Sequence, residues 1–361
     1  MISKNFFESL QLIAEERKLD IEDILKKVEI ALGVACRHVN PPYTGDIKLE
    51  VNFEQKKIRA FEYKYVVDQI DPNGPRGQIL LEEAQKIKDR AKVGQIIKTE
   101  IDFSIFKRKP AQYFKQIFNN GLKELERERA YQYFKERVGD IITAKVVSVN
   151  DGFITFNIGL GYESHMPIKE GLEGEEYNIG DEKKVYITKV EKTGKGPKVF
   201  ISRANKEIVK RLFEITIPEI SNGDIEIMGI ARDPGSRTKI GVMSLNPNID
   251  AKGACVGAGG LRIKSINAAL NDEKIDVFTW KEDPVELIAE ALLPARVLSV
   301  MLDQKEKKAT VIVDDDQYSL AIGRNGQNAR LAAYVTNWKI DIKKLSDAQE
   351  EGIEFEYNVT G

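Results

Sequence analysis

The sequence predicts a multidomain α+β protein, and three observations lead to this fold class. The chain of 361 residues is too long for one ordinary domain. Its hydrophobic content of 42% supports packed cores, and 31% charged residues is typical of a soluble protein. The spacing of apolar residues changes from helical to alternating near Val138, and a unit that occurs twice begins at Asn205. We therefore expect roughly two to four domains.

Residues 1–137 are expected to form an α+β amino-terminal domain. Apolar residues recur at helical spacing over residues 1–35, and Pro41 and Pro42 interrupt this pattern. Short β-rich runs predict strands at residues 47–51, 58–61 and 96–103. A long charged helix is expected to close the domain at about residues 110–137.

Residues 138–204 are expected to form a small β-barrel. Apolar and polar side chains alternate there over short stretches, which is typical of strands. Five strands are predicted, at residues 142–149, 153–158, 161–167, 184–190 and 198–202. Five short strands in one small domain favour a five-stranded OB-type barrel.

The repeated unit occupies residues 205–282 and 283–345. Each copy is predicted to run helix, strand, strand, helix, G-x-x-G loop, helix, strand. This order is that of the bacterial-type (type II) KH domain, whose G-x-x-G loop contacts a nucleic-acid backbone. Few residues separate the copies, so we expect two tandem KH domains packed as one rigid body. Residues 346–361 are expected to be a short acidic tail.

The two G-x-x-G loops are the candidate phosphate-binding elements. They are Gly257-Ala258-Gly259-Gly260 and Gly323-Arg324-Asn325-Gly326. Glycine lets the backbone approach phosphates closely and adopt a positive φ. A helix that begins directly after each loop places free N–H groups and the positive end of its dipole beside an anion. The first loop does not continue as a dinucleotide-binding G-x-G-x-x-G motif, because Arg262 stands at the last position.

Charge is unevenly distributed along the chain. The formal net charge is −2, but the segment after Lys344 contains five acidic residues and no Lys or Arg, so the remainder is net positive. Residues 104–137 hold nine basic and four acidic side chains. Phosphate binding depends on such local clusters. The basic run Lys107-Arg108-Lys109 is a candidate RNA contact, although Glu124, Glu126 and Glu128 make a solvated charged helix face an equal alternative.

The sequence gives little support for an enzyme, a metal site or a cofactor. The two cysteines, Cys36 and Cys255, are expected to be buried reduced thiols. Cys36 and His38 alone do not supply the roughly four ligands of a zinc site. No G-x-S-x-G motif surrounds a candidate nucleophilic serine. The chain has no apolar run of membrane-spanning length, and we expect a cytoplasmic monomer.

Three stretches resemble the NusA family of bacterial transcription termination/antitermination proteins. They are Ala231-Arg232-Asp233-Pro234-Gly235-Ser236-Arg237-Thr238-Lys239, Gly253-Ala254-Cys255-Val256-Gly257 and Ala321 to Ala332. The order of modules is similar too: a polymerase-binding domain, a ribosomal S-one-type barrel and two KH domains. The resemblance implies a non-enzymatic elongation factor that binds RNA polymerase and nascent single-stranded RNA, with other Nus-type transcription factors as further partner candidates. The alternative is an RNA-binding factor of translation or RNA decay.

The resemblance also implies which residues contact RNA. Besides the eight loop residues, these lie on the helices behind the loops and on the nearby strands: Arg262, Lys264, Gln327, Asn328, Arg330, Arg232, Arg237, Lys239 and Lys252. Ala258 and Gly259 depart from the basic or larger residues of many family members. The first loop is therefore expected either to bind less tightly or to depend more on Arg232, Arg237, Lys239 and Lys252.

Aromatic residues of the barrel are further candidates. Phe153, Phe156, Tyr162 and His165 are of the types on which bases stack in S-one-type domains, and we select Phe153 and His165 as RNA contacts. Phe153 and Phe156 are three residues apart and point to opposite faces of a regular strand. At most one of these two is therefore expected to be exposed.

Overall fold

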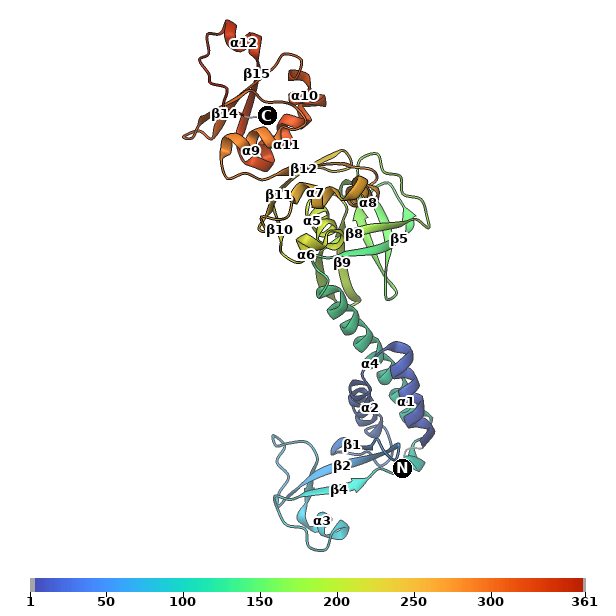
Figure 1. Ribbon diagram of the computed structural model, residues 1–361. Helices are drawn as coiled ribbons and strands as arrows, with labels where there is room; N and C mark the ends of the chain where they lie inside the picture. The colour runs from blue at the N-terminus through green and yellow to red at the C-terminus, as the bar shows by residue number, and fades with distance from the viewer. Residues whose placement is uncertain (1–3, 360–361) are drawn as a thin grey trace. The chain divides into compact units, whose positions relative to one another are not determined.

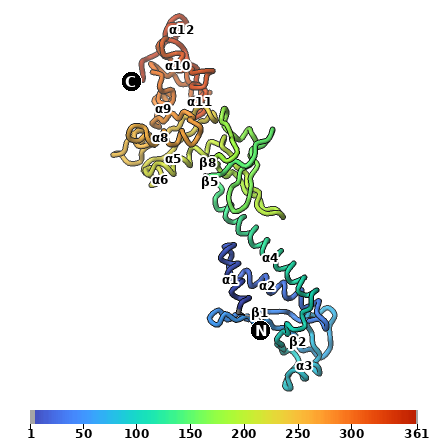
Figure 2. The backbone as a smooth tube through the Cα atoms, turned by 90° about the vertical axis from the view of Figure 1, so that its right-hand side faces the viewer, coloured from blue at the N-terminus to red at the C-terminus, as the bar shows by residue number. Residues whose placement is uncertain are grey.

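The computed structural model describes residues 4–359. The first three residues of the predicted amino-terminal helical region and the last two of the predicted tail lie outside this range. The chain divides into two compact units. One reaches to Tyr133 and includes the segment Lys192–Pro197; the other contains Phe134–Glu191 and continues from Lys198 (Figures 1 and 2).

The first unit is α+β, as predicted. Helices α1 (Lys4–Arg17) and α2 (Ile21–Cys36) precede a four-stranded sheet, and α4 (Arg108–Lys135) follows it. The strands are β1 (Asp46–Asn52), β2 (Lys57–Val67), β3 (Gln78–Leu80) and β4 (Ile96–Glu100). Apolar side chains of α1, α2, the sheet and α4 share one core, among them Phe7, Ile24, Ile58 and Phe118. Strand β3 and helix α3 (Leu81–Ile87) are additions that the apolar spacing did not predict.

The second unit begins with a five-stranded barrel. Its strands are β5 (Ile141–Val149), β6 (Phe153–Gly159), β7 (Tyr162–Pro167), β8 (Glu182–Thr193) and β9 (Gly196–Ser202), in the order β7-β6-β5-β8-β9. The two outer strands meet where the Ser164 hydroxyl donates to the Val199 carbonyl at 2.7 Å. This bond brings the edges of the sheet together and makes the barrel nearly closed.

Two repeats of the same topology follow the barrel within the second unit. The first contains α5 (Glu207–Thr216), α6 (Pro218–Ser221), β10 (Ile225–Asp233), β11 (Arg237–Ser244), α7 (Ala251–Val256), α8 (Leu261–Ala269) and β12 (Lys274–Thr279). The second contains α9 (Pro284–Ala291), β13 (Ser299–Asp303), β14 (Lys308–Val313), α10 (Tyr318–Ile322), α11 (Gln327–Thr336) and β15 (Lys339–Lys344). In both sheets the middle strand pairs antiparallel with the first and parallel with the last. The predicted α-β-β-α-α-β order is confirmed.

The two repeats share a hydrophobic core. Ala231 and Phe278 of the first sheet are buried together with residues of α9 and α11 from the second repeat. Glycines permit this close packing, because a Cβ at Gly229 would lie 3.1 Å from Val335 of α11. Within the first repeat, a Cβ at Gly241 would lie 2.7 Å from Trp280, a side chain that packs against the shared core. The shared core is the physical basis for treating the repeats as one body.

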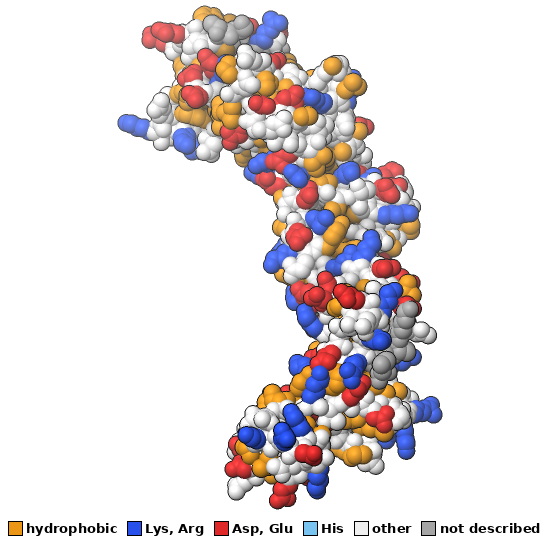
Figure 3. All heavy atoms as spheres, turned by 60° about the horizontal axis from the view of Figure 1, so that its bottom comes forward, with side chains coloured by type: hydrophobic (Ala, Val, Ile, Leu, Met, Phe, Trp, Pro, Cys, Tyr) orange, Lys and Arg blue, Asp and Glu red, His pale blue; other side chains and the backbone are white. Residues whose placement is uncertain are grey.

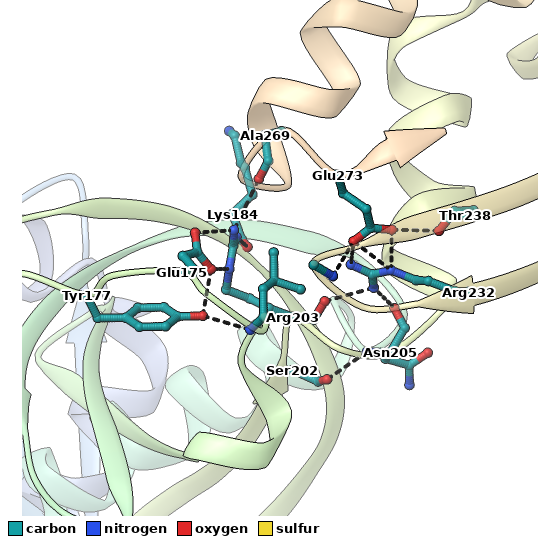
Figure 4. Close-up of polar contacts among 12 residues, drawn as sticks. Glu175, Tyr177, Lys184, Ser202, Arg203, Asn205, Arg232, Thr238, Ala269 and Glu273 are labelled. Carbon is teal, nitrogen blue, oxygen red and sulfur yellow. Dashed lines mark hydrogen bonds and ion pairs between the residues drawn. The ribbon is translucent and has the colours of Figure 1, made fainter. Parts of the chain in front are cut away.

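Two buried arginines fasten the barrel to the first repeat (Figure 4). The guanidinium of Arg203 binds both carboxylate oxygens of Glu175 and also donates to the carbonyls of Lys184 and Ala269. Arg232 binds Glu273 and donates to the carbonyls of Arg203 and Asn205. Each arginine side chain is 1% exposed. Because burying a charge without a partner is costly, losing one of these partners would destabilise the junction.

Part of the predicted acidic tail is folded against the second repeat. Helix α12 (Leu345–Glu350) was not predicted, and its Ala348 is buried. Farther along, the Asn358 side chain accepts from the Val300 N–H and donates to the Val300 carbonyl, both at 2.9 Å. Val300 lies on β13, an edge strand of its sheet. The amide therefore takes the place of a neighbouring strand and covers part of an otherwise open edge.

Candidate nucleic-acid interface

The first G-x-x-G loop has a backbone that requires glycine. Gly257, Gly259 and Gly260 have φ angles of 74°, 61° and 76°. A Cβ at Gly257 would also lie 2.9 Å from the Arg262 side chain. The loop joins α7 to the nine-residue helix α8, whose first N–H groups follow it directly. This combination of a tight turn and a helix N-terminus suits an anionic ligand.

The second loop has the same conformation with a different sequence. Gly323, Asn325 and Gly326 have φ angles of 73°, 54° and 71°, which match the first loop position by position. Asn325 takes the place of Gly259, and asparagine tolerates the left-handed region better than most residues. Arg324 is exposed at the tip, where the first loop has Ala258. The loops therefore present equivalent backbones, but the second also presents a guanidinium.

The second residue of the helix that follows each loop makes its polar contacts within its own repeat. Arg262 donates to the Ala254 carbonyl at 2.7 Å and pairs with Glu219 at 2.9 Å. At the same position of the second repeat, the buried Asn328 amide donates to the Ala321 and Leu292 carbonyls, both at 3.0 Å. Both side chains tie the loop helix to the helices before it. We leave Asn328 out of the RNA surface because it is buried, and assign Arg262 to holding the loop.

Three basic residues that the family resemblance placed on the RNA surface hold the fold together. Arg232 is buried against Glu273, as described above. Lys239 is 1% exposed and donates to the Leu293 carbonyl at 2.9 Å, and burial lowers its pKa to about 8. Arg237 is partly buried and pairs with Asp276 at 2.7 Å. The expected RNA contacts at Arg232 and Lys239 are therefore corrected, because their charged ends point into the protein.

The remaining predicted side chains around the loops are accessible. Lys252 and Lys264 are exposed beside the first loop, where the Lys264 ammonium donates to the Gly259 carbonyl at 3.1 Å. Behind the second loop, Gln327 is half-buried and Arg330 is exposed, although one of its N–H groups pairs with Asp233 at 2.9 Å. Within residues 4–359, Arg324 has no ion-pair partner. The cationic groups that remain available thus gather around the loops themselves.

The barrel offers one exposed aromatic face. Phe153 is 50% exposed and Phe156 is fully buried, which confirms that they point to opposite sides of β6. The pairing of β6 with β7 joins Phe153 to Pro167 and Thr155 to His165, so Phe153 and His165 share the outer face. The exposed His165 ring is held by Thr155 at 2.9 Å. Tyr162 is half-buried and lies edge-on to Phe134.

The basic helix α4 is largely a paired, solvated surface. Lys27 pairs with Glu124 at 2.7 Å and Arg17 with Glu126 at 2.8 Å. Figure 3 shows the same character more widely, because Lys and Arg side chains alternate with Asp and Glu over the visible face. At the start of α4, Lys107, Arg108 and Lys109 are exposed, and Tyr113 stacks on His38 at 3.9 Å. The start of the helix therefore remains the better candidate for RNA.

Neither cysteine is reactive in this structure. Cys36 and Cys255 are both free and buried, as predicted. Burial raises the pKa of each thiol to about 12, so neither forms a thiolate near neutral pH. Among residues 4–359, no cluster of His, Cys, Asp and Glu is suited to a metal ion. No helix in that range is both long enough and apolar enough to cross a membrane.

Sequence reasoning missed the acidic residues of the site. Glu219, Glu273 and Asp276 hold Arg262, Arg232 and Arg237, respectively. Asp233 binds two side chains of the second repeat. Asp233 stands in one of the stretches that carry the family resemblance, but neither its type nor its spacing indicated a partner far along the chain.

Comparison with known proteins identifies a series of modules between residues 5 and 350. Family models match in order along the chain: the NusA N-terminal domain at residues 5–128, the S1 RNA binding domain at 135–202, and the NusA-like first and second KH domains at 203–280 and 284–350. A Bacillus subtilis relative named transcription termination/antitermination protein NusA is 42% identical over 352 residues, which cover 98% of this chain and 94% of the relative. The chain belongs to the NusA family. The S1-type barrel and tandem KH domains are thereby confirmed.

Two further NusA relatives are similar over nearly the full chain. The Halalkalibacterium halodurans protein is 41% identical and covers 98% of this chain and 91% of the relative. The Thermus thermophilus protein is 36% identical and covers 97% of this chain and 92% of the relative. Both carry the name transcription termination/antitermination protein NusA. The family resemblance that the sequence suggested is therefore confirmed.

Proposed function

We propose that this chain is a non-enzymatic transcription elongation factor that binds RNA polymerase and nascent RNA. It would act in the cytoplasm, as a monomer or with other Nus-type factors, to modulate pausing, termination and antitermination. One observation carries the RNA half of the proposal: the two G-x-x-G loops share one conformation and belong to one hydrophobically packed body. The names and full-length similarity of the relatives support the transcription half.

RNA binding would rest on the backbone of both loops and on the cations beside them. Single-stranded RNA would lie with its phosphates against the loop N–H groups and the starts of α8 and α11. Arg324 and Arg330 would add charge at the second loop, and Lys252 and Lys264 at the first. Because Ala258 is neutral, the first loop would contribute less affinity, and the exposed ring of Phe153 would offer a stacking surface on the barrel.

The amino-terminal unit would dock on RNA polymerase near the emerging RNA. Lys107, Arg108 and Lys109 would face that RNA from the start of α4. The chain makes and breaks no bond in this mechanism. It biases polymerase because it binds paused and moving states with different affinity, and a ligand shifts an equilibrium by no more than that difference.

Arg324→Ala tests the RNA half of the proposal. We expect the affinity for single-stranded RNA to fall about threefold to tenfold, because the exposed guanidinium at the loop tip is lost. The slope of log affinity against log salt should become shallower by about 0.7, the value for one phosphate contact on a single strand. Fluorescence anisotropy over a salt series measures both quantities.

The matched control for this variant is Arg76→Ala, which removes an exposed arginine from a loop of the amino-terminal unit. This variant should keep both the affinity and the slope of the parent chain. If Arg324→Ala behaves in the same way as the control, the second loop does not bind RNA through this side chain.

A further inference from the structure

The turn between β10 and β11, Asp233–Ser236, is fixed to the barrel. Gly235 has a φ of 81°, and a Cβ there would lie 2.7 Å from the backbone N and O of Glu173 in the barrel. The Gly235 N–H donates to Glu273 at 2.8 Å, and the same carboxylate holds Arg232. Close backbone contact on one side and a buried ion pair on the other leave this turn little freedom.

The other side of the turn holds the second G-x-x-G loop. The Asp233 carboxylate accepts from Gln327 at 2.7 Å and from Arg330 at 2.9 Å. The Gln327 amide also donates to the Ser236 hydroxyl at 2.8 Å. Gln327 is the first residue of α11, directly after the loop, and Arg330 follows about one turn later. Polar side chains behind the second loop are therefore held by the first KH domain.

The first loop is held differently. Leu261, which corresponds to Gln327, is 70% exposed. Lys264, which corresponds to Arg330, donates to the carbonyl of Gly259 in its own loop. The link between a loop and a neighbouring module is thus a feature of the second loop, where Arg324 and Arg330 gather positive charge.

We propose that Asp233 is a positioning residue for RNA binding at the second loop, a role that rests on the function proposed above. Its carboxylate engages one Nη of Arg330 and the amide of Gln327, and so orients the remaining guanidinium N–H groups of Arg330 for phosphate. Because Gly235 packs on Glu173 of the barrel, this one turn contacts both the barrel and the helix behind the second loop. Asp233 therefore sets where the cations of the second loop stand relative to the barrel.

The direction in which RNA affinity changes when Asp233 loses its charge distinguishes a positioning role from electrostatic repulsion. An acidic group beside an RNA surface repels phosphate, so removing its charge should strengthen binding if Coulomb repulsion dominates. If Asp233 positions Arg330, removing its charge should weaken binding because a phosphate contact loses its geometry. The two accounts predict opposite directions for the same substitution.

Asp233→Asn in the full chain is the test, with single-stranded RNA of randomised sequence as the probe. We expect the affinity to fall about threefold and the salt slope to become shallower by about 0.7, as for one lost phosphate contact. Asp303→Asn is the matched control, because Asp303 ends β13 as Asp233 ends β10. Within the part of the chain that the structure describes, its carboxylate accepts only from the local N–H groups of Lys305 and Glu306. The control should bind as well as the parent chain or better.

Two further variants complete the experiment. Adding Arg330→Ala to Asp233→Asn should cause no loss beyond that of Arg330→Ala alone, because the two residues act as one unit. Asp233→Glu keeps a carboxylate and should recover most of the affinity, which a general loss of folding would not allow.

The outcomes separate the proposal from the function on which it rests. Equal or tighter binding by Asp233→Asn, with a parental salt slope, would overturn the positioning role while RNA binding stands. If the parent chain binds no RNA, the proposed function itself fails, whereas unchanged binding by a charged variant of the second loop would remove only that loop from the mechanism.

Discussion

Replacing Gly326 with Asp is expected to lower the affinity for single-stranded RNA at least about tenfold without unfolding the protein. A carboxylate at this position would stand against the RNA backbone, and two unit charges about 4 Å apart near a protein surface interact by about 1–4 kcal/mol. Gly326 has a φ of 71°, and a Cβ there would meet nothing within 4 Å. The native state therefore bears only the cost of a left-handed aspartate, about 1–2 kcal/mol.

The control for this variant, Gly94→Asp, introduces the same left-handed aspartate at a position outside the G-x-x-G loops. Gly94 lies in the amino-terminal unit with a φ of 87° and has the same open space around its Cβ position. Gly94→Asp should keep the parental RNA affinity. Gly323 is less suitable for the test, because a Cβ there would lie 2.8 Å from the backbone N of Asn328. Unchanged RNA binding by a folded Gly326→Asp variant would remove the second loop from the mechanism.

Glu273→Gln is expected to lower the free energy of unfolding by about 3–5 kcal/mol, the usual effect of removing one partner from a buried ion pair. The Glu273 side chain is fully buried and accepts from Arg232, Thr238 and the Gly235 N–H. A neutral amide would leave the Arg232 charge buried without a counterion. It would also place N–H groups where three donors now point, so both charge and hydrogen bonding would be disturbed.

Urea unfolding monitored by circular dichroism measures this effect. The control is Asp341→Asn, whose pair with Lys308 spans 3.6 Å and is about half exposed. Such pairs contribute about 1 kcal/mol or less. Similar urea midpoints for the two variants would show that the Arg232–Glu273 pair does not hold the junction between the barrel and the first KH domain.

Most of the fold was predictable because it follows from periodicity. The long α4, the five barrel strands and the repeated α-β-β-α-α-β order all leave clear spacing patterns in the sequence. The elements that were missed are short: β3 has three residues, α3 seven, α6 four and α12 six. Segments of that length contain too few apolar positions to distinguish a helix or strand from a loop.

The candidate site was predictable in its backbone and less so in its side chains. The glycines of both loops predicted a positive φ, and the structure shows it at Gly257, Gly260, Gly323 and Gly326. Arg232 and Lys239 could not be distinguished from surface cations in the sequence. Their acidic partners, Glu273 and Asp276, lie 41 and 37 residues away and reach them only through strand pairing and packing.

Pause duration at a hairpin-dependent site tests the central claim most directly. Purified cognate RNA polymerase would transcribe one template with and without this chain, and the pause half-life would be compared. The account predicts a longer pause when the chain is present. An unchanged half-life, with RNA binding by the same preparation intact, would contradict a role in elongation and favour an RNA-binding factor of translation or RNA decay.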